Sequence, residues 1–588
     1  MCGIAGICLA GKAKVSAGLL APLAKALAHR GPDGEAVWAE GGLGLVHTRL
    51  AIVDVAGGAQ PLVAKFPDGE VALAANGEIY NYPELQTELR AAGVRLSTRS
   101  DCEPPLWLYG REGVSAFDKL QGMYGLVLAD TRDGTMVVAR DCFGIKPLYY
   151  AETAKGFACA SEPRALLAAG WVAREMNREA LGVVLGFHDS PGDATLFAGV
   201  KRLMPGEWLV VKEGKIVRRG RRLAPLAAPV ARGDEAALEQ FDALMKAAMR
   251  RHLQGEVGVG AFLSGGLDST NMVLALRDLG VEVRSFTARF SVDGAKDESA
   301  VARTLARQVG ALHTEVVYGE EDFWPGVVDM AWALDDMALD YAALPLLKLS
   351  HAAREAGVKV VLSGEGGDEI FGGYKSYQRP WWKELLRGWR GGELQAVRGY
   401  LKDKKLADAK RHVALPWPLK GWSVLQKKQG ADVAGWLPDG LLLKLDRTLM
   451  VQGVEGRVPY LDDQLAAFGF ALPDALKVRE GWGKWLLRER LKRRGFGELA
   501  FGKKQGFSVP VGAWLHSGQH RVANLWRQSK FIDGVLTPKG REAMLGKLRD
   551  RKVAKVAFSL TVMACWHAMH MEGATRDDVL RLMNAPRG

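Results

Sequence analysis

Cysteine is scarce in this sequence, which has six cysteines among 588 residues. They are spread over nearly the whole chain, and no two of them form a CxxC pair. Such spacing fits neither a disulfide-rich scaffold nor a zinc site. We therefore expect reduced thiols at Cys2, Cys8, Cys102, Cys142, Cys159 and Cys565.

Long hydrophobic runs are also missing. The longest stretches without Lys, Arg, Asp or Glu are residues 505–520 and 556–571, and both are too short to cross a bilayer. Gly and Pro interrupt the first stretch, whereas the second, which carries His567 and His570, predicts a buried helix. The N-terminus has no basic segment ahead of an apolar run, so it predicts no secretory signal. We expect a cytoplasmic protein with no membrane partner.

The excess of one charge is small. The chain has 79 Lys and Arg against 67 Asp and Glu, which gives a net charge of +12. The basic residues are distributed, and runs such as residues 218–222 are short, which argues against nucleic acid as a partner. With 48% hydrophobic and 25% charged residues and a mean hydropathy of −0.05, the composition excludes disordered and fibrous proteins. The length predicts more than one domain.

The first part of the chain, residues 1–211, alternates short apolar runs with Gly-rich turns, which predicts a β-rich domain. The runs are residues 43–46, 71–75, 125–129, 135–139 and 148–151. Residues 212–234 are rich in Lys, Arg, Gly, Pro and Ala and lack apolar periodicity, so they predict a linker.

Beyond the linker, strands and helices alternate, which predicts a parallel α/β domain over residues 235–527. We expect helices at residues 235–252 and 270–279, and strands at 257–263, 281–286 and 358–362. Residues 379–440 are Trp-rich and basic, and predict either a helical insertion with packing anchors or a binding surface. Residues 528–588 predict a helical tail.

The first candidate site is the N-terminus itself. If Met1 is removed, Cys2 carries a thiol and an α-amine on one residue. The amine, with an ordinary pKa of about 7.7 to 8.0, can take the thiol proton near neutral pH. The alternative is that Cys2 is only a small residue at a chain start.

Other residues supply what a thiol attacking a carboxamide needs. Asn76 and Gly77, after an apolar run, can donate a side-chain NH2 and a backbone NH to an oxyanion. Arg49 can bind an α-carboxylate as a fork, and Glu78 and Asp101 can bind an α-amine. The pattern therefore indicates selection of an amino-acid amide. Cys102 beside Asp101 lacks an adjacent base, and we interpret it as a structural thiol.

Five motifs in one order over about a hundred residues strengthen this interpretation: MCGIAG (residues 1–6), HRGPD (29–33), RLAIVD (49–54), NGEIYN (76–81) and SDCE (100–103). They resemble class II glutamine amidotransferase domains, especially those of glutamine-hydrolysing asparagine synthetases. The resemblance implies an Ntn-hydrolase αββα sandwich with Cys2 as nucleophile and Asn76 and Gly77 as oxyanion hole. It implies glutamine binding by Arg49, Leu50, Ile52, Val53, Asn76, Gly77, Glu78 and Asp101.

The second candidate site consists of two glycine-rich loops that follow predicted strands. SGGLDS (264–269) joins a strand to a helix start, which gathers backbone NH groups for a phosphate. It matches neither the Walker A nor the GxGxxG pattern, and alone it could be a glycine turn with an Asp-Ser cap. SGEGGDE (363–369) follows the strand at 358–362. In a parallel sheet both loops can line one crevice.

The SGGLDS loop resembles that of ATP pyrophosphatases, which implies a Rossmann-like domain that binds ATP and Mg²⁺. Asp268 and Asp368 are then the expected Mg²⁺ ligands, Glu365 faces the acceptor or transfers a proton, and Lys484 neutralises phosphates. The implied ATP contacts are Leu263, Ser264, Gly265, Gly266, Asp268, Ser269, Ala288, Ser363 and Gly364. Residues 453–462 and 503–510 extend the resemblance to about residue 515.

The resemblance implies a glutamine-dependent asparagine synthetase whose small-molecule partners are glutamine, aspartate and ATP, with ammonia crossing between the domains. Many relatives have Asp-Glu-Pro where this chain has Asp335-Asp336-Met337, and residues 339–345 lie where acceptor contacts are expected. The alternative is therefore the same chemistry on another carboxylate, such as a peptide or a modified amino acid. A nucleic-acid-binding protein on a degenerate enzyme scaffold is a third hypothesis. The sequence does not determine the oligomeric state, and a homodimer is one alternative.

Overall fold

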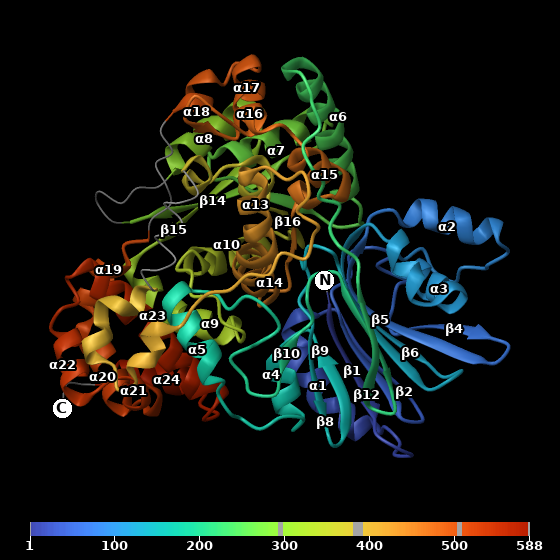
Figure 1. Ribbon diagram of the computed structural model, residues 1–588, viewed down its shortest axis with the longest axis horizontal. Helices are drawn as coiled ribbons and strands as arrows, with labels where there is room; N and C mark the ends of the chain where they lie inside the picture. The colour runs from blue at the N-terminus through green and yellow to red at the C-terminus, as the bar shows by residue number, and fades with distance from the viewer. Residues whose placement is uncertain (1, 292–297, 380–391, 503–508, 586–588) are drawn as a thin grey trace.

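The computed structural model describes residues 2–291, 298–379, 392–502 and 509–585. Residues 380–391 of the expected insertion and residues 503–508 of the motif at 503–510 lie outside the described residues. Figure 1 shows three regions: a β-rich region formed by the first part of the chain, an α/β region above it, and a helical region formed largely by the C-terminal part.

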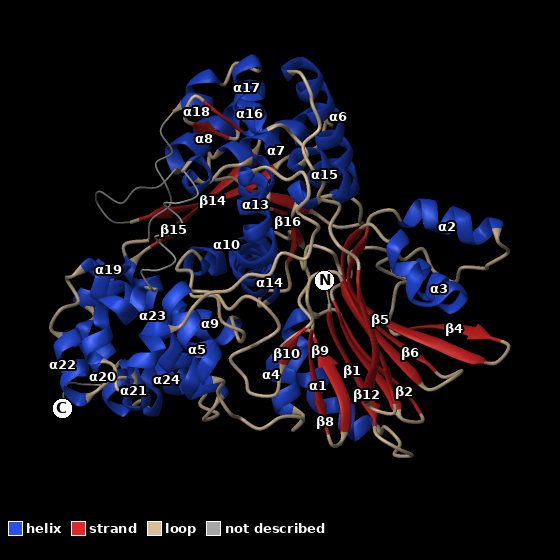
Figure 2. Cartoon of the chain, in the orientation of Figure 1, coloured by secondary structure: helices blue, strands red, loops and turns tan. Residues whose placement is uncertain are grey.

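Two antiparallel sheets build the first region (Figure 2). The first sheet has the order β10 (Lys201–Arg202), β8 (Tyr149–Thr153), β9 (Gly156–Ala160), β1 (Gly3–Leu9), β3 (Leu43–Arg49) and β2 (Gly34–Glu40). The second has the order β12 (Lys215–Arg221), β11 (Glu207–Lys212), β7 (Thr135–Arg140), β6 (Gly122–Asp130), β5 (Gly69–Ile79) and β4 (Leu62–Phe66).

The two sheets face each other across an apolar core that includes Ile4, Leu45 and Val127. Helices cover the outer faces: α1 (Ala17–Leu27) and α4 (Pro163–Ala168) pack on the first sheet, and α2 (Tyr82–Ala91) and α3 (Glu103–Glu112) lie over the second. Short 3₁₀ turns, η1 (Ala28–Arg30) and η2 (Gly113–Lys119), extend α1 and α3. The predicted αββα sandwich is confirmed.

The start of the expected linker differs from the prediction. Residues 215–221, expected as coil, form β12, which pairs with β11 at the edge of the second sheet. Most side chains of β12 are exposed, so backbone pairing holds the strand and its basic sequence carries no apolar pattern. The irregular connection to the next region is therefore shorter than predicted, at residues 222–233.

A parallel five-stranded sheet forms the centre of the second region, as predicted. Its order is β15 (Leu312–Tyr318), β14 (Arg284–Phe290), β13 (Val259–Phe262), β16 (Val360–Leu362) and β17 (Glu455–Arg457). The accompanying helices are α6 (Asp234–His252), α7 (Leu267–Asp278), α8 (Ser299–Val309), α9 (Glu320–Ala333), α10 (Ala343–Glu355) and α11 (Gly367–Phe371).

The strand order places β13 beside β16, although about a hundred residues separate them in the chain. The chain runs outward from β13 through β14 to β15 and then returns to β16 on the other side. This reversal is a topological switch point, where ligands bind beyond the carboxyl ends of the strands. The two glycine-rich loops follow β13 and β16 and therefore meet at this point.

Short elements follow α11 in the chain. They are η3 (Lys375–Gln378), η4 (Glu393–Tyr400), η5 (Lys404–Asp408), α13 (Val424–Ala431), η6 (Asp432–Leu442), α14 (Leu443–Met450), η7 (Pro459–Leu461), α15 (Asp463–Phe470), α16 (Asp474–Lys477), the antiparallel pair β18 (Val478–Arg479) and β19 (Trp482–Gly483), α17 (Trp485–Arg493) and α18 (Gly497–Phe501). Of these, η4 and η5 pack on α5 (Arg178–Phe187), and η4 also packs on the C-terminal helices. Within the insertion, Trp417 and Trp422 are buried with ring centroids 5.9 Å apart, as expected of packing anchors. Trp381, Trp382 and Trp389 lie outside the described residues.

The C-terminal helices pack on the rest of the molecule. They are α19 (Val511–Ser517), α20 (Gln519–Gln528), α21 (Lys530–Val535), α22 (Pro538–Leu545), α23 (Arg551–His570) and α24 (Arg576–Met583). The buried α23, predicted from its charge-free run, packs against α9, and the Trp566 Nε1 donates to the Asp335 carbonyl at 2.7 Å. From the first region, α5 (Arg178–Phe187) joins this cluster (Figure 1). In the described ranges, no helix is both long and apolar enough to span a bilayer.

Candidate active sites

Cys2 directly precedes β1, and it is buried. Its backbone N donates to the Asn76 Oδ1 at 3.0 Å, and its Sγ lies 4.0 Å from the Leu50 carbonyl. The Arg30 Nε donates to the Cys2 carbonyl at 3.2 Å. Burial raises the pKa of the Cys2 thiol, so a base close to the Sγ is needed to form the thiolate.

Asn76 and Gly77 lie in the last part of β5, next to Cys2. The Asn76 Nδ2 is buried and has no hydrogen-bond partner among the described residues. A buried donor left without a partner costs free energy, which a bound oxyanion would recover. Gly77 has φ +155°, and a Cβ there would collide with the Met123 carbonyl, so only glycine fits beside β6.

Arg49 ends β3 and is held by the loop that follows. Its Nη1 donates to the Val55 carbonyl at 2.9 Å and its Nη2 to the Asp54 carbonyl at 2.8 Å. The guanidinium is close enough to lower the pKa of the Cys2 thiol, against the larger effect of burial. Leu50 and Ile52 are buried in this loop, and Val53 is half-buried.

Glu78 and Asp101 lie side by side, and both are buried. The Ile79 backbone N donates to the Asp101 Oδ2 at 2.9 Å. Burial raises the pKa of Asp101 to about 6. Burial also raises the pKa of Glu78, and the nearby Arg457 guanidinium opposes that rise. The structure thus brings Cys2, Asn76, Gly77, Arg49, Leu50, Glu78 and Asp101 to one place.

Cys102 is buried beside these carboxylates. Its Sγ lies 3.6 Å from the Asp101 Oδ2, and burial together with the Asp101 charge raises the pKa of the thiol well above its ordinary value. A buried thiol next to a carboxylate is a poor nucleophile. The location is consistent with our interpretation of Cys102 as structural.

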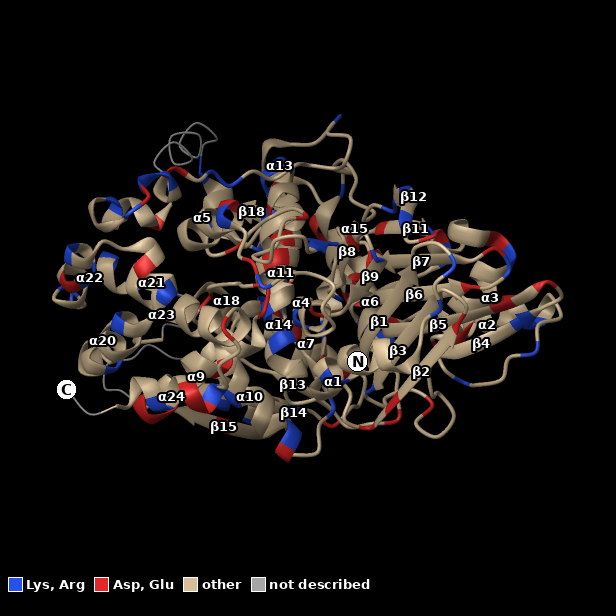
Figure 3. Cartoon of the chain, turned by 90° about the horizontal axis from the view of Figure 1, so that it is seen from below, with Lys and Arg blue, Asp and Glu red and all other residues tan. Residues whose placement is uncertain are grey.

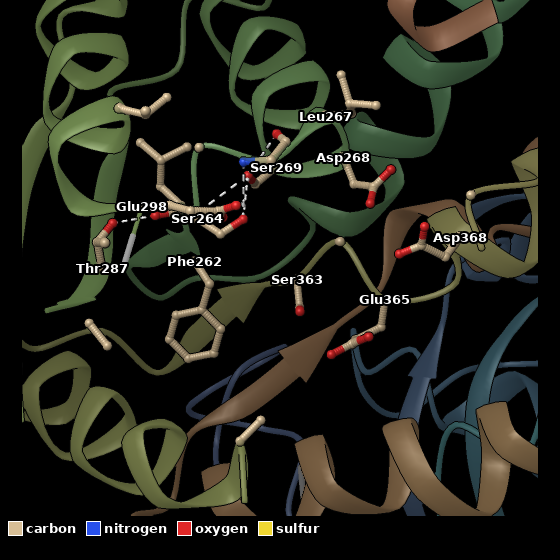
Figure 4. A pocket seen from close by; sticks show the side chains of 18 of the residues that line it. Phe262, Ser264, Leu267, Asp268, Ser269, Thr287, Glu298, Ser363, Glu365 and Asp368 are labelled. Carbon is tan, nitrogen blue, oxygen red and sulfur yellow. Dashed lines mark hydrogen bonds between the residues drawn. The ribbon is translucent and has the colours of Figure 1, made fainter. Parts of the chain in front are cut away.

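The second site is a cavity of about 490 Å³ at the switch point (Figure 4). This size suits a small ligand. The cavity is lined by residues of both glycine-rich loops, by the end of β13 and the middle of β14, and by α10, α14 and the turn before α17. All expected ATP-contact residues line it: Leu263, Ser264, Gly265, Gly266, Asp268, Ser269, Ala288, Ser363 and Gly364.

The loop after β13 is organised by its own hydroxyl groups. The Ser264 and Ser269 Oγ atoms lie 3.2 Å apart, and the Gly266 N donates to the Ser264 Oγ at 3.2 Å. Gly265 has φ +72°, a conformation that favours glycine. The loop ends at the N-terminus of α7, which offers backbone NH groups and the positive end of the helix dipole to a phosphate.

The second loop packs closely on the first. A Cβ on Gly364 would lie 2.9 Å from the Asp268 Cβ, so glycine permits this approach. The Lys484 Nζ lies 2.5 Å from the Asp268 Oδ2 and 2.6 Å from the Asp368 Oδ1. Burial lowers the pKa of Lys484, but the two carboxylates raise it more, so this lysine is charged.

The carboxylates fit a hard divalent cation. Asp268 and Asp368 both line the cavity and both contact the Lys484 Nζ, so their carboxylates lie close together. Mg²⁺ is typically held by one or two carboxylates together with phosphates and water. No larger cluster of three ligating side chains occurs among the described residues. The donor set therefore matches Mg²⁺ bound together with a nucleotide.

Glu365 lines the cavity on the side away from Ser264 and Ser269 (Figure 4). Burial raises its pKa, and Lys444 opposes this rise. By contrast, Asp335 and Asp336, where the sequence departs from many relatives, are not in the cavity lining. They are fully buried, with Asp336 2.5 Å from the Arg202 Nη2 and Asp335 3.1 Å from the Arg447 Nε. The two residues where the sequence departs from many relatives therefore form ion pairs outside the cavity lining.

Buried ion pairs join the β-rich and α/β regions, and sequence reasoning assigned no role to them. Arg30 lies 2.9 Å from Asp446 and from Glu162. Arg457 on β17 lies 2.8 Å from Glu78 and 2.5 Å from Glu455. Arg30 and Arg457 lie inside the motifs at 29–33 and 453–462, so the sequence marks them as residues of interest. It does not show which carboxylates they contact, because those carboxylates include residues distant in the chain.

A small apolar cluster also lies between the two regions. Leu50 and Ile52, next to Cys2, pack with Val360 on β16 and with Met450 at the end of α14. Residues beside the thiol thus contact the strand that leads to the second loop. Figure 3 shows that Lys and Arg are interspersed with Asp and Glu over the molecule.

Comparison with known proteins gives the following matches. The pattern of the family described as "Asparagine synthase" matches residues 240–568, and that of "Glutamine amidotransferase domain" matches residues 1–220. A curated protein named glutamine-hydrolyzing asparagine synthetase 1, from Bacillus subtilis, is 30% identical over 604 residues, which cover 94% of each chain. Glutamine-hydrolyzing asparagine synthetase 2 from Lotus japonicus is 28% identical and covers 89% of this chain and 80% of its own.

One solved structure, of the allosteric regulatory enzyme of purine biosynthesis, covers 54% of this chain and 80% of its own. Its sequence identity is 16% and its TM-score is 0.30. This likeness is too weak to carry an argument about function.

Proposed function

The chain belongs to the asparagine synthase family, and on that basis we propose that it is a glutamine-dependent asparagine synthetase. The strongest support is that one chain contains both sites. Cys2 is buried beside the Asn76 Nδ2, which has no hydrogen-bond partner among the described residues. A cavity of nucleotide size lies between the two glycine-rich loops. Glutamine is the nitrogen donor, ATP activates the acceptor, and aspartate is that acceptor. Cytoplasmic location is part of the proposal, and a homodimer is one alternative for its assembly.

The first half-reaction takes place at Cys2. Once Met1 is removed, the α-amine takes the thiol proton, and the thiolate attacks the carboxamide carbon of glutamine. The Asn76 Nδ2 and the Gly77 NH stabilise the oxyanion of the tetrahedral intermediate. Ammonia leaves, a thioester remains on the Sγ, and water hydrolyses the thioester to glutamate. Arg49 binds the α-carboxylate of glutamine, and Glu78 and Asp101 bind its α-amine. Leu50, Ile52 and Val53 form the rest of the glutamine site.

The second half-reaction takes place in the cavity. The β-carboxylate of aspartate attacks the α-phosphorus of ATP, pyrophosphate leaves, and ammonia then attacks the acyl adenylate to give asparagine and AMP. The NH groups of the 264–269 loop and Lys484 neutralise phosphate charge. Glu365 takes the proton that the attacking nitrogen loses. Asp268 and Asp368 would hold Mg²⁺, which would supply charge stabilisation on the phosphates.

Ammonia has to pass from one site to the other. Ammonia in bulk water at neutral pH is largely protonated, and ammonium has no lone pair with which to attack. A route enclosed between the two regions avoids this loss. The apolar cluster of Leu50, Ile52, Val360 and Met450 supports such a route, because it lies between Cys2 and the strand that leads to Ser363.

The deciding experiment supplies glutamine, aspartate and MgATP to the purified protein and measures products by mass spectrometry. We expect asparagine, glutamate, AMP and pyrophosphate in equal amounts. Pyrophosphate without asparagine, formed when another carboxylate replaces aspartate, would support the alternative acceptor. ADP and phosphate as products would contradict the assignment of the cavity.

A further inference from the structure

Lys444 is a buried cation on the wall of the nucleotide cavity, and sequence reasoning did not single it out. It lies in the first turn of α14, and its side chain is only 5% exposed. Apolar and small residues of α10 and its N-terminus, Ala342, Pro345 and Leu346, line the same cavity. A lysine in such surroundings has lost most of its water, so an anion close by is needed to compensate.

Asp340 is the partner that holds this lysine. The Lys444 Nζ donates to the Asp340 Oδ2 at 2.5 Å, and the Asp340 Oδ1 accepts from the Ala342 backbone N at 3.0 Å. Burial raises the pKa of Asp340, but Lys444, the Ala342 N–H and His188 together lower it more, so both Asp340 and Lys444 are charged. The Asp340 carboxylate is thus fixed by the backbone, and it fixes the ammonium group at the cavity wall.

The ammonium group keeps donors for a ligand. A lysine has three N–H donors, and among the described residues Asp340 is the one hydrogen-bond partner of the Lys444 Nζ. Lys484, in contrast, is engaged by both Asp268 and Asp368 on the phosphate side of the cavity. The two lysines of the cavity lining therefore have separate surroundings.

Lys444 lies on the Glu365 side of the cavity. Its charge lowers the pKa of Glu365 against burial, and Glu365 in turn raises the pKa of Lys444, so the two groups are neighbours. Ser264 and Ser269, in the loop after β13, lie away from Glu365 (Figure 4). A cation beyond Glu365 is placed to bind the part of the acceptor that does not react.

We propose that Lys444 binds a second carboxylate of the acceptor, with Asp340 as the residue that positions it. This inference deepens the proposed function, on which it rests: the acceptor is a dicarboxylate in which one carboxylate reacts with ATP and the other is held by Lys444. For aspartate, the held group is the α-carboxylate. A peptide whose α-carboxylate is in an amide bond is excluded as acceptor by the same argument.

The test uses aspartate and β-alanine, which differ only in the α-carboxylate, in acceptor-dependent release of pyrophosphate. With the wild-type enzyme we expect kcat/KM for aspartate to exceed that for β-alanine by about 100-fold, the value of a charge-assisted hydrogen bond. Lys444→Met should remove this preference with the KM for ATP unchanged. Lys444→Arg, which keeps the positive charge, should keep part of the preference for aspartate over β-alanine. Asp340→Asn should raise the KM for aspartate and keep the preference.

Lys348→Met is the matched control, because the Lys348 Nζ forms a similar pair with Asp322 at 2.6 Å outside the cavity lining. It should keep the preference for aspartate. Thermal denaturation reports folding of all variants. A Lys444→Met enzyme that still prefers aspartate by the wild-type ratio would overturn the inference.

A measurement on the wild-type enzyme covers the case in which the variants do not fold. Succinate, with two carboxylates, should inhibit aspartate-dependent pyrophosphate release competitively, and propionate, with one, should be at least tenfold weaker. Equal inhibition by the two would contradict the inference. If the enzyme activates a monocarboxylate in place of aspartate, both the acceptor and the inference are wrong. If it activates a different dicarboxylate, only aspartate is wrong.

Discussion

The Arg457 guanidinium, at the end of β17 in the α/β region, lies 2.8 Å from the Glu78 carboxylate in the β-rich region. Both side chains are buried, and the Ser363 backbone N donates to the Arg457 carbonyl at 2.9 Å. One residue therefore contacts the glutamine site through its side chain and the nucleotide loop through its backbone. If Glu78 binds glutamine as proposed, glutamine binding depends on the α/β region through this contact.

Replacing Arg457 by Met should raise the KM for glutamine. Without the guanidinium, the pKa of Glu78, which burial already raises, rises further, so less of the carboxyl is ionised to bind the α-ammonium group. We expect an increase of about tenfold or more, measured by glutamate release. Lys359→Met, which breaks the pair with Asp33 at 2.7 Å between the same regions, is the control and should leave this KM unchanged.

Breaking a buried pair also costs stability, about 3 to 5 kcal/mol. The kinetic comparison should therefore be made at a temperature where thermal denaturation shows Arg457→Met to be folded. An unchanged KM in a folded variant would contradict the coupling.

Replacing Cys2 by Ala should abolish glutamine-dependent synthesis and leave ammonia-dependent synthesis close to the wild-type rate. The nucleophile and the adenylation cavity lie in different regions, and the change removes one sulfur atom. Asparagine formation with glutamine and with ammonium chloride as donors measures both activities. Loss of both in a folded protein, or full activity in protein that retains Met1, would contradict the assignment.

Asp268→Asn and Asp368→Asn should each lower adenylation by about 1,000-fold, since a metal ligand beside a triphosphate supplies several kcal/mol to the transition state. Glutaminase activity should stay measurable, because Cys2 and its neighbours are unchanged. Aspartate-dependent exchange of labelled pyrophosphate into ATP, with and without EDTA, measures the effect. Exchange at the wild-type rate in either variant would remove that carboxylate from the proposed set.

The pH dependence of glutamine hydrolysis should show the titration of Asp101. Its pKa of about 6 means that the carboxylate loses its charge below pH 6, so kcat/KM for glutamine should fall tenfold per pH unit there. Asp101→Asn should have a low, flat profile in this range. The same inflection in the variant would assign it to another group.

The raised pKa of Asp101 also affects stability. The folded protein binds this proton more tightly than the unfolded chain, in which the ordinary value is 3.8. The contribution of Asp101 to stability is therefore full below about pH 4 and is lost as the pH rises through 6. Chemical denaturation of the wild type and Asp101→Asn over this pH range measures the free energy of unfolding of each. The difference between the two values should become smaller as the pH falls.

Nitrogen transfer should be closed to solvent. With amide-¹⁵N glutamine and an excess of unlabelled ammonium, we expect asparagine to carry the label undiluted at saturating glutamine. Ile52→Ser, which places a hydroxyl in the apolar cluster, should increase dilution by external ammonia. Strong dilution in the wild type would show that the two sites exchange ammonia with bulk water.

Much of the fold and of each half-site could be predicted from the sequence. The strands that became β3, β5, β6 and β7 and the loops after β13 and β16 were found because alternating apolar runs and glycine turns are local signals. The edge strand β12 was missed because it is exposed and held by backbone pairing alone. The same locality explains why Cys2, Asn76, Asp268 and Asp368 were named without a structure.

The sequence by itself determined which chemistry is present: an N-terminal thiol with an oxyanion donor, and glycine loops with carboxylates. Only the tertiary structure decided how these parts meet. Arg457 and Glu78 are 379 positions apart, and Lys444 and Asp340 are 104 apart, yet each pair is in direct contact. Such pairs depend on the packing of whole regions, and a charged residue carries no local signal of the partner that burial will give it.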